Sequence, residues 1–309
     1  LNRKIGEEIR SLTEALAAEP TAAPASPTRQ ESAQEAPQIV RLPSERAAES
    51  DAGSTEGVQR ALVRAVASGE AEISLQPIIS VSQSAASGFE VHMHLEPGDG
   101  GRAVDIRRLA QAVPGLDPAG FETAMVRAAI AAGRRQLGSS AERMPFHLAV
   151  SEALLASAEV NALAELADVH KALPASLMFS IPAALLAQGG EVRAGIDRLT
   201  AAGFRLAAEN WDGSAEDAEA AGRRGVAYVK IAANRLLDRE KSRKRTATGA
   251  ELAAAAQEAG LTVVATDVSR DEDAVGLIDL GIDLMVGERF SGPRRIRSAA
   301  ARQAAMTGT

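Results

Sequence analysis

Two short apolar runs of this sequence each stop at a charged residue. The run Phe204–Ala208 ends at Glu209. The run Val226–Val229 ends at Lys230, and an Ala- and Glu-rich stretch of helical character separates the two runs. A strand, a helix and a second strand form one unit of a parallel sheet, and in closed α/β barrels the chemistry lies at the carboxyl ends of the strands. We therefore expect any active-site rim to include Glu209 and Lys230.

A glutamate and three histidines form a second group of candidate site residues. Glu90, His92 and His94 alternate along one strand-like run, so their side chains should share a face. If that face is the lumen of a barrel, His147 on the next strand lies near them. Two interpretations stay open. The histidines form a zinc-like or iron-like site with Glu90 and Glu209, or they are hydrogen-bonded residues that fill space in the lumen.

Composition narrows the class of protein. The 309 residues are 46% hydrophobic and 24% charged, which suffices for a sizeable core. The chain has no cysteine, which excludes disulfides and thiolate metal sites and favours a reducing compartment. The net charge of −7 offers no broad attraction to nucleic acid or to anionic lipid. We therefore expect no nucleic-acid partner.

The location of the protein is predicted from what the sequence lacks. No run approaches the ~20 apolar residues of a membrane span, and no signal peptide is visible. The chain opens on Leu1 rather than on Met. We expect a cytoplasmic protein, tethered to the inner membrane only if an N-terminal segment that precedes this sequence carries an anchor.

Four regions follow one another along the chain. Residues 1–18 predict a coiled-coil helix or, alternatively, a single amphipathic helix, because their large apolar residues are spaced by four, three and four. Residues 19–57 are rich in Pro, Ala, Ser, Glu and Gln and predict a disordered linker. The folded domain spans residues 58–298, and residues 299–309 form a tail.

The folded domain alternates strand-like and helical segments. Its strand-like runs are residues 73–79, 88–95, 145–150, 177–181, 204–208, 227–231, 262–265 and 283–286. Four of the runs follow a glycine, where a helix must end and the chain turn back: Gly203, Gly225, Gly260 and Gly281. The pattern predicts a closed α/β barrel of about eight strands.

Seven segments carry a family resemblance. In chain order they are SLQPIISV, GFEVHMHL, FHLAVSEALL, GFRLAAENWDGS, YVKIAANRL, GLTVVATDVSRDED and GIDLMVGERFSGP. They resemble the YQPIV, GxEALLRW, VNLSxxxL, GxRLALDDFGTG, YLKIDxxFV, GxxVVAEGVETEEQ and GCDLxQGYxFSxP segments of the EAL domain, the barrel that hydrolyses the bacterial second messenger cyclic di-GMP. The resemblance spans about Val58 to Pro293. It implies a TIM-like (β/α)8 barrel whose first strand is antiparallel to the others.

The resemblance also implies a two-metal site, whose ligands are carboxylates, an Asn and a Gln. Glu90 matches the motif Glu, and Lys230 matches the lysine of the YLKID strand. Glu209 stands at the first Asp of DDFGTG, and Asn210 replaces the second. The other active positions carry residues without a carboxylate: His147, Ser180, Ala183, Ala232, Thr266, Ser269 and Val286.

Two carboxylates are too few to hold two divalent ions against hydration. We therefore expect a degenerate domain with no phosphodiesterase activity and no cofactor, in which Glu90, Glu209 and Lys230 are remnants of the catalytic set.

Binding of cyclic di-GMP is a separate question from cleavage. Gln76 matches the Gln of YQPIV, which in the family helps to hold the dinucleotide. His94 replaces an Arg and Glu288 replaces a Tyr, which weakens the site for a ligand with two negative charges. The candidate ligand-binding residues are Gln76, Glu90, His94, Glu209, Asn210 and Lys230.

Three functions remain open. The first is an inactive EAL module that serves as a cyclic di-GMP receptor or signalling scaffold. Its layout resembles the coiled-coil-plus-EAL regulators of polar flagellum assembly in alphaproteobacteria. The second is a residual phosphodiesterase with Glu90, Glu209 and Lys230 around one metal. The third is a scaffold without a small ligand, which recruits partners or a second copy through the coiled coil or through the loop Asn210–Asp217, where EAL domains commonly dimerise.

Overall fold

The computed structural model describes residues 72–95, 104–105, 117–137, 144–239 and 247–296. The predicted coiled-coil helix, the linker and the C-terminal tail lie outside these residues, as does the start of the predicted folded domain.

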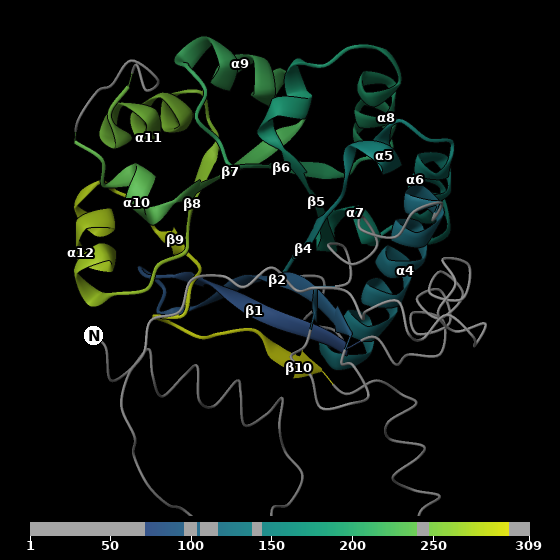
Figure 1. The fold of residues 1–309 in the computed structure, drawn as a ribbon, viewed down its shortest axis with the longest axis horizontal. Coiled ribbons are helices and arrows are strands. Elements are labelled where there is room, and N and C mark those ends of the chain that lie inside the picture. The colour runs from purple at the N-terminus through teal and green to yellow at the C-terminus, as the bar shows by residue number, and fades with distance from the viewer. Residues whose placement is uncertain (1–71, 96–103, 106–116, 138–143, 240–246, 297–309) are drawn as a thin grey trace, which may run out of the picture.

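Eight of the described strands close into a ring (Figure 1). β1 (Glu72–Ser80) is antiparallel to both of its neighbours in the ring, β2 (Ala85–Leu95) and β9 (Leu284–Met285). Each remaining pair in the ring is parallel. The strands between β2 and β9 are β4 (Phe146–Ala149), β5 (Leu177–Pro182), β6 (Arg205–Glu209), β7 (Val226–Ala232) and β8 (Thr262–Thr266). The predicted barrel with an antiparallel first strand is confirmed.

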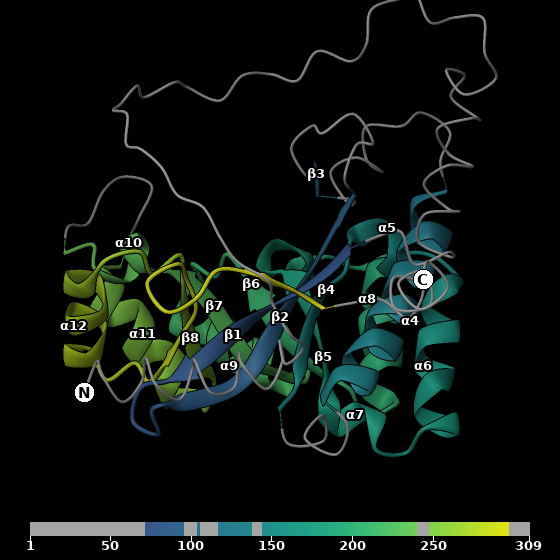
Figure 2. The same cartoon turned by 90° about the horizontal axis from the view of Figure 1, so that it is seen from below.

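Two short strands prolong the ring at one end. β10 (Arg294–Ile296) pairs with the first half of β1, and β9 pairs with its last two residues. β3 (Val104–Asp105) pairs with the end of β2 beyond the point where β4 stops. The first two strands of the barrel are therefore longer than the rest and project past its rim (Figure 2).

Helices surround strands β4 to β9 (Figure 1). They are α4 (Pro118–Leu137), α5 (Glu152–Leu155), α6 (Glu159–Val169), α7 (Leu173–Ser176), η4 (Ala183–Ala187), α8 (Gly190–Ala201), α9 (Ala215–Arg223), α10 (Ala233–Leu236), α11 (Gly249–Glu258) and α12 (Asp271–Asp279). Among the described residues, no helix combines the length and the apolar composition that a membrane span needs.

The main hydrophobic core lies between the barrel and these helices. Phe89, Val91 and Met93 of β2 belong to it, whereas Glu90 and His92 between them point to the opposite face, as the period of a strand requires. A second, smaller cluster of Ile78, Val264 and Val286 packs with Tyr228 and Leu284. Since these five side chains come from β1, β7, β8 and the β9 region, they fill the lumen.

Glycines end the helices that precede the strands. Gly203 and Gly225 have φ of 91° and 84°, in the left-handed region that a Cβ disfavours. Gly260 and Gly281 adopt the same region before β8 and before β9. The predicted turns are thus observed, and they deliver each parallel strand in the same direction. All the parallel strands therefore end at one rim.

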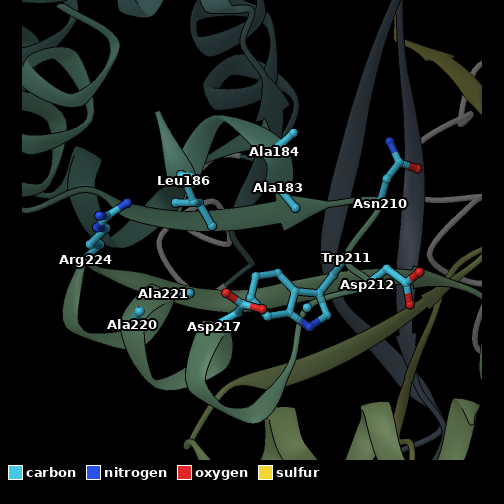
Figure 3. A pocket seen from close by; sticks show the side chains of 12 residues that line it. Ala183, Ala184, Leu186, Asn210, Trp211, Asp212, Asp217, Ala220, Ala221 and Arg224 are labelled. Carbon is cyan, nitrogen blue, oxygen red and sulfur yellow. The ribbon is translucent and has the colours of Figure 1, made fainter. Parts of the chain in front are cut away.

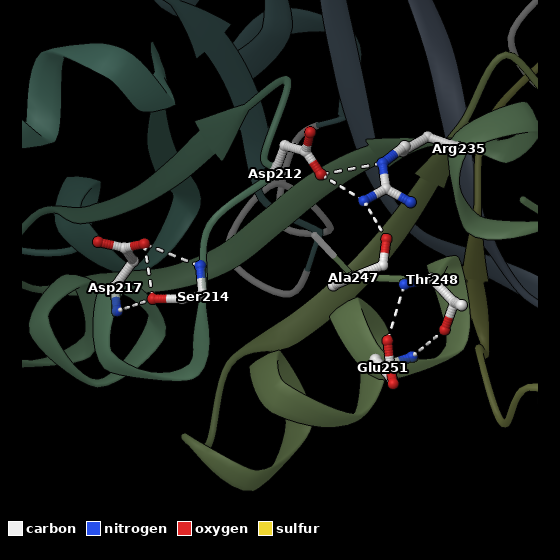
Figure 4. Close-up of polar contacts among 7 residues, drawn as sticks. All are labelled: Asp212, Ser214, Asp217, Arg235, Ala247, Thr248 and Glu251. Carbon is white, nitrogen blue, oxygen red and sulfur yellow. Dashed lines mark hydrogen bonds and ion pairs between the residues drawn. The ribbon is translucent and has the colours of Figure 1, made fainter. Parts of the chain in front are cut away.

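Two helices begin at this rim with a capping box (Figure 4). Ser214 and Asp217 form the box of α9, and Thr248 and Glu251 form that of α11. In each, a hydroxyl accepts a backbone N–H of the first turn while a carboxylate accepts the N–H of the cap residue. The segment that leads from β6 into α9 is therefore fixed where it enters α9.

Candidate functional site

A buried lysine lies between two carboxylates at the carboxyl ends of the strands. The side chain of Lys230, from β7, is only 5% exposed. Its Nζ lies 2.9 Å from Oε1 of Glu90 on β2 and 3.5 Å from Oε1 of Glu209 on β6. These three residues, far apart in the sequence, are thus brought together. Desolvation of an ammonium is costly, and two acidic partners offset that cost.

The carboxyl of Glu90 is held in its ionised form. Burial alone would raise its pKa, but the charge of Lys230, its hydrogen bond and the nearby His92 together lower the pKa below 4.5. Glu90 is therefore an anion at neutral pH, and the pair with Lys230 is charged.

The next strand supplies a buried neutral imidazole. His147 on β4 is 3% exposed and lies beside Glu90 in the strand register. Burial, and then the charges of Lys230 and Arg205, hold its pKa well below 6.5. Its ring meets the edge of Tyr228, with 5.5 Å between centroids. Within the described residues, His147 Nδ1 has no hydrogen-bond partner, so the lumen contains a buried, uncharged nitrogen without a partner.

Ser180 on β5 is a second buried polar side chain without a hydrogen-bond partner among the residues that the structure describes. The residue is fully buried. Such groups are uncommon in protein interiors and call for an explanation. Both orphan groups lie on neighbouring strands and face the lumen.

Gln76 is held in one orientation by two bonds. Its Nε2 donates to the backbone carbonyl of Ser291 at 3.0 Å. Its Oε1 lies 3.2 Å from Nε2 of His92, which must donate because an amide oxygen only accepts. His92 Nε2 also lies 3.9 Å from Glu90. His92 therefore links Gln76, a predicted ligand-binding residue, to Glu90, the partner of Lys230.

Other predicted residues lie further out on the rim. His94 is half-buried near the end of β2, with its ring 6.3 Å from that of His92. Asn210 is exposed and has a φ of 54° directly after Glu209. Asn tolerates this left-handed conformation better than most residues. Asn210 therefore lies on the rim, outside the cluster of Lys230 with its two carboxylate partners.

Two residues of the site were missed from the sequence. Tyr228 contacts His147 in the lumen, and no sequence spacing indicates that contact. Asp267 is exposed after β8, has a φ of 58° and accepts a hydrogen bond from Thr266. It follows an apolar strand in the same way as Glu209 does, and that signal could have found it. Asp267 adds a carboxylate to the rim.

The Lys230 ammonium limits how well this site can bind a divalent metal ion. In the described part of the chain, no three His, Asp or Glu side chains gather closely enough to hold a metal ion. The two closest carboxylates, Glu90 and Glu209, both face the Lys230 ammonium. An ion between them would have to displace that cation, because like charges repel at this distance. In this conformation the residues therefore do not form a metal site, and the predicted histidine site does not assemble.

The family of the chain is established by a match to the model of the EAL domain over residues 59–293. This match covers well over half of the chain, so the chain belongs to the EAL family. The family relationship predicted from the seven segments is confirmed. No curated protein matches the chain significantly.

Solved structures of EAL proteins share the fold. The structure of the EAL enzyme Bd1971 with cAMP and cyclic di-GMP bound has a TM-score of 0.63 at 16% identity, over 84% of this chain and 70% of that one. The PaMucR phosphodiesterase in complex with c-di-GMP has a TM-score of 0.62 at 16% identity, over 76% and 96%. An EAL domain protein from Listeria monocytogenes has a TM-score of 0.60 at 15% identity, over 82% and 97%.

The prediction that the chain is not an enzyme is wrong on these findings. The chain belongs to a family of cyclic di-GMP phosphodiesterases, and its structural relatives include one described as a phosphodiesterase and one described as an enzyme. The prediction rested on counting replaced motif positions. Such a count leaves out oxygen donors beyond the motif, and Asp267 is one at this rim.

Proposed function

We propose that the carboxyl end of the barrel binds cyclic di-GMP and that Lys230, Gln76, His147 and Ser180 form the floor of the site. The observation that carries the proposal is the set of buried polar side chains that face the lumen, with Lys230 near its carboxyl end. Lys230 supplies ammonium N–H donors for a phosphate oxygen, in exchange for one of its present partners, Glu90 or Glu209. Gln76, His147 and Ser180 supply donors and acceptors for the rest of the dinucleotide.

The remaining predicted residues have supporting roles in this proposal. Glu90 and Glu209 orient Lys230, as their distances of 2.9 and 3.5 Å to its Nζ indicate. His94 and Asn210 lie on the rim, where an incoming ligand passes. Because cyclic di-GMP is a bacterial second messenger, the proposal places the barrel in the cytoplasm.

Calorimetry with cyclic di-GMP tests the proposal. We expect binding by the full chain, and binding weakened by about tenfold or more in Lys230→Met and Gln76→Leu, because each loses a polar contact to the ligand. Lys171→Met is the matched control, since Lys171 pairs with Asp168 on the surface. Thermal unfolding of each variant shows that it is folded. Absence of heat with the folded wild-type chain would refute the proposal and favour a scaffold without a small ligand.

Hydrolysis of the dinucleotide is the second candidate function. It is favoured by membership of the EAL family and by the phosphodiesterase PaMucR among the structural relatives. In this reaction water adds to phosphorus, one ester P–O bond breaks, and the product is the linear dinucleotide. Chromatography after incubation with Mg²⁺ or Mn²⁺ detects that product. We expect Glu90→Gln to abolish any such activity, whereas Glu152→Gln, on the exposed surface of α5, leaves it unchanged.

The cellular role is proposed from the layout of the chain. We infer a signalling module in which the barrel senses cyclic di-GMP and the N-terminal region, or the loop Asn210–Asp217, contacts protein partners. A role in polar flagellum assembly or motility rests only on the resemblance of this layout to flagellar regulators. Deletion of the gene should then impair swimming, and complementation with the Lys230→Met chain should fail to restore it.

A further inference from the structure

A separate cavity of about 400 Å³ lies outside the barrel. One wall is η4, which follows β5, and the other is α9 with the segment Asn210–Gly213, which follows β6 (Figure 3). Ligand pockets for small molecules usually measure about 300–1,000 Å³. The cavity is therefore large enough for a small organic molecule.

The walls of the cavity are apolar and small. They include the alanines of η4 and of α9, the buried Leu186 and the indole of Trp211, which is 4% exposed. Gly213 packs against this ring, since a Cβ at residue 213 would lie 2.6 Å from Trp211 Cζ2. The indole is thus held in place by its neighbours, and a flat apolar body is the shape that suits such a surface.

A positively charged side chain, that of Arg224, lies at one end of the cavity, and Asn210 and Asp212 lie at the opposite end (Figure 3). Asp212 is already paired with Arg235, and Asp217 keeps its negative charge while its carboxylate accepts the hydrogen bonds of the capping box of α9. Among the described residues, Arg224 has no ion pair. A guanidinium beside an apolar wall is suited to an anion with an apolar body.

We propose that this cavity binds a small aromatic carboxylate, with the carboxylate paired to Arg224 and the ring against the alanines and Trp211. The occupant would touch a segment that leads directly to the barrel mouth. Asn210 follows Glu209, and the backbone N–H of Trp211 donates to the carbonyl of Lys230 at 3.1 Å. The site is therefore distinct from the mouth but adjoins it.

Nuclear magnetic resonance of the full chain provides a direct test, because Trp211 is the only tryptophan in the sequence. Its indole N–H therefore gives a single resonance. Titration with 1-naphthoate should displace this resonance in a saturable manner. The neutral analogue 1-naphthalenemethanol should bind about tenfold more weakly, since it lacks the charge-assisted bond to Arg224.

Two arginine variants form the matched pair for this test. Arg224→Gln should weaken naphthoate binding about tenfold and abolish the preference over the neutral analogue. Arg223→Gln should leave both unchanged, because Arg223 pairs with Glu219 on the surface and does not line the cavity. Equal naphthoate affinity in the two variants would overturn the assignment of Arg224.

A third variant fills the cavity with a larger side chain. Ala220→Leu places a larger side chain on the half-buried wall of the cavity, and we expect loss of naphthoate binding with an unchanged circular dichroism spectrum. An indole resonance of the wild-type chain that does not move up to millimolar naphthoate would refute the proposal. Neither result depends on whether the mouth binds cyclic di-GMP.

Discussion

Two buried cations lie five residues apart on the same strand–helix segment, and they are neutralised in different ways. Lys230 lies in the lumen between two carboxylates, Glu90 and Glu209. Arg235 lies on the outer side of the rim, where its Nε and one terminal nitrogen contact a single oxygen of Asp212 at 2.9 and 2.6 Å (Figure 4). The lumen cation thus has an excess of acidic partners, and the rim cation has one.

The partners of Arg235 indicate a structural role. Besides Asp212, it donates to the backbone carbonyl of Ala247 at 3.0 Å. It therefore ties the segment after β6 to the start of α11. Among the described residues, the Lys230 ammonium contacts only side chains. In the same part of the chain, unpartnered buried atoms occur beside both cations, at His147 and Ser180 in the lumen and at one terminal nitrogen of Arg235 itself. We therefore expect Arg235 to stabilise the segment after β6, and Lys230 to exchange a carboxylate partner for a ligand.

The largest effect on stability should come from Lys230→Met. The change leaves two carboxylates facing each other without a cation, and we expect a loss of about 2–4 kcal/mol in the free energy of unfolding. This is less than a fully buried pair would lose, because the side chain of Glu209 is 30% exposed. Urea unfolding measures the loss. The double variant Glu90→Gln with Lys230→Met should recover part of it, and no recovery would show that charge repulsion is not the cause.

Arg235→Met should have a smaller effect, about 1–2 kcal/mol. It removes the bond to the carbonyl of Ala247, but Asp212 is 46% exposed and can turn to water. We expect cyclic di-GMP affinity to stay within about twofold of the wild-type value, in contrast to Lys230→Met. Urea unfolding and calorimetry on the same samples make the comparison. A loss of ligand affinity as large as that of Lys230→Met would contradict the division of roles.

Near neutral pH the smallest effect should come from His147, because its contribution depends on pH and appears only as the pH falls. Because the pKa of folded His147 lies well below 6.5, only the unfolded chain gains this proton as pH falls through 6.5. Stability should therefore decrease below about pH 6.5 and be unaffected by this group above it. His147→Gln should flatten the curve of unfolding free energy between about pH 6.5 and 4.5. An unchanged slope would exclude His147 as its source.

Glu90, an acidic side chain, should affect stability at lower pH than the basic side chain of His147. Its folded pKa is below 4.5, so its stabilising contribution is complete above that pH and is lost as pH falls through the lowered value. Glu90→Gln should therefore alter the acid limb below about pH 4.5, whereas His147→Gln alters the limb above it. The two variants separate the two groups within one titration.

The fold and the outline of the site could be read from the sequence. Glycines such as Gly203 end the preceding helices, and the apolar run before Glu209 ends where β6 ends. β7, however, continues two residues beyond Lys230, to Ala232. Because parallel strands of a barrel end at one rim, Glu209 and Lys230 were expected to meet, and they do. The alternation of Glu90 with His92 likewise predicted a shared face.

Only the tertiary structure decided the contacts between side chains. The ring contact of His147 with Tyr228, the bond from Arg235 to Asp212 and the cavity beside Trp211 depend on strand register and on the volume left between helices. A local pattern does not contain these quantities, because they arise from packing of segments far apart in the chain. The sequence determined the barrel and the charged residues at its rim, and packing decided which of those charges are paired and which polar groups remain available.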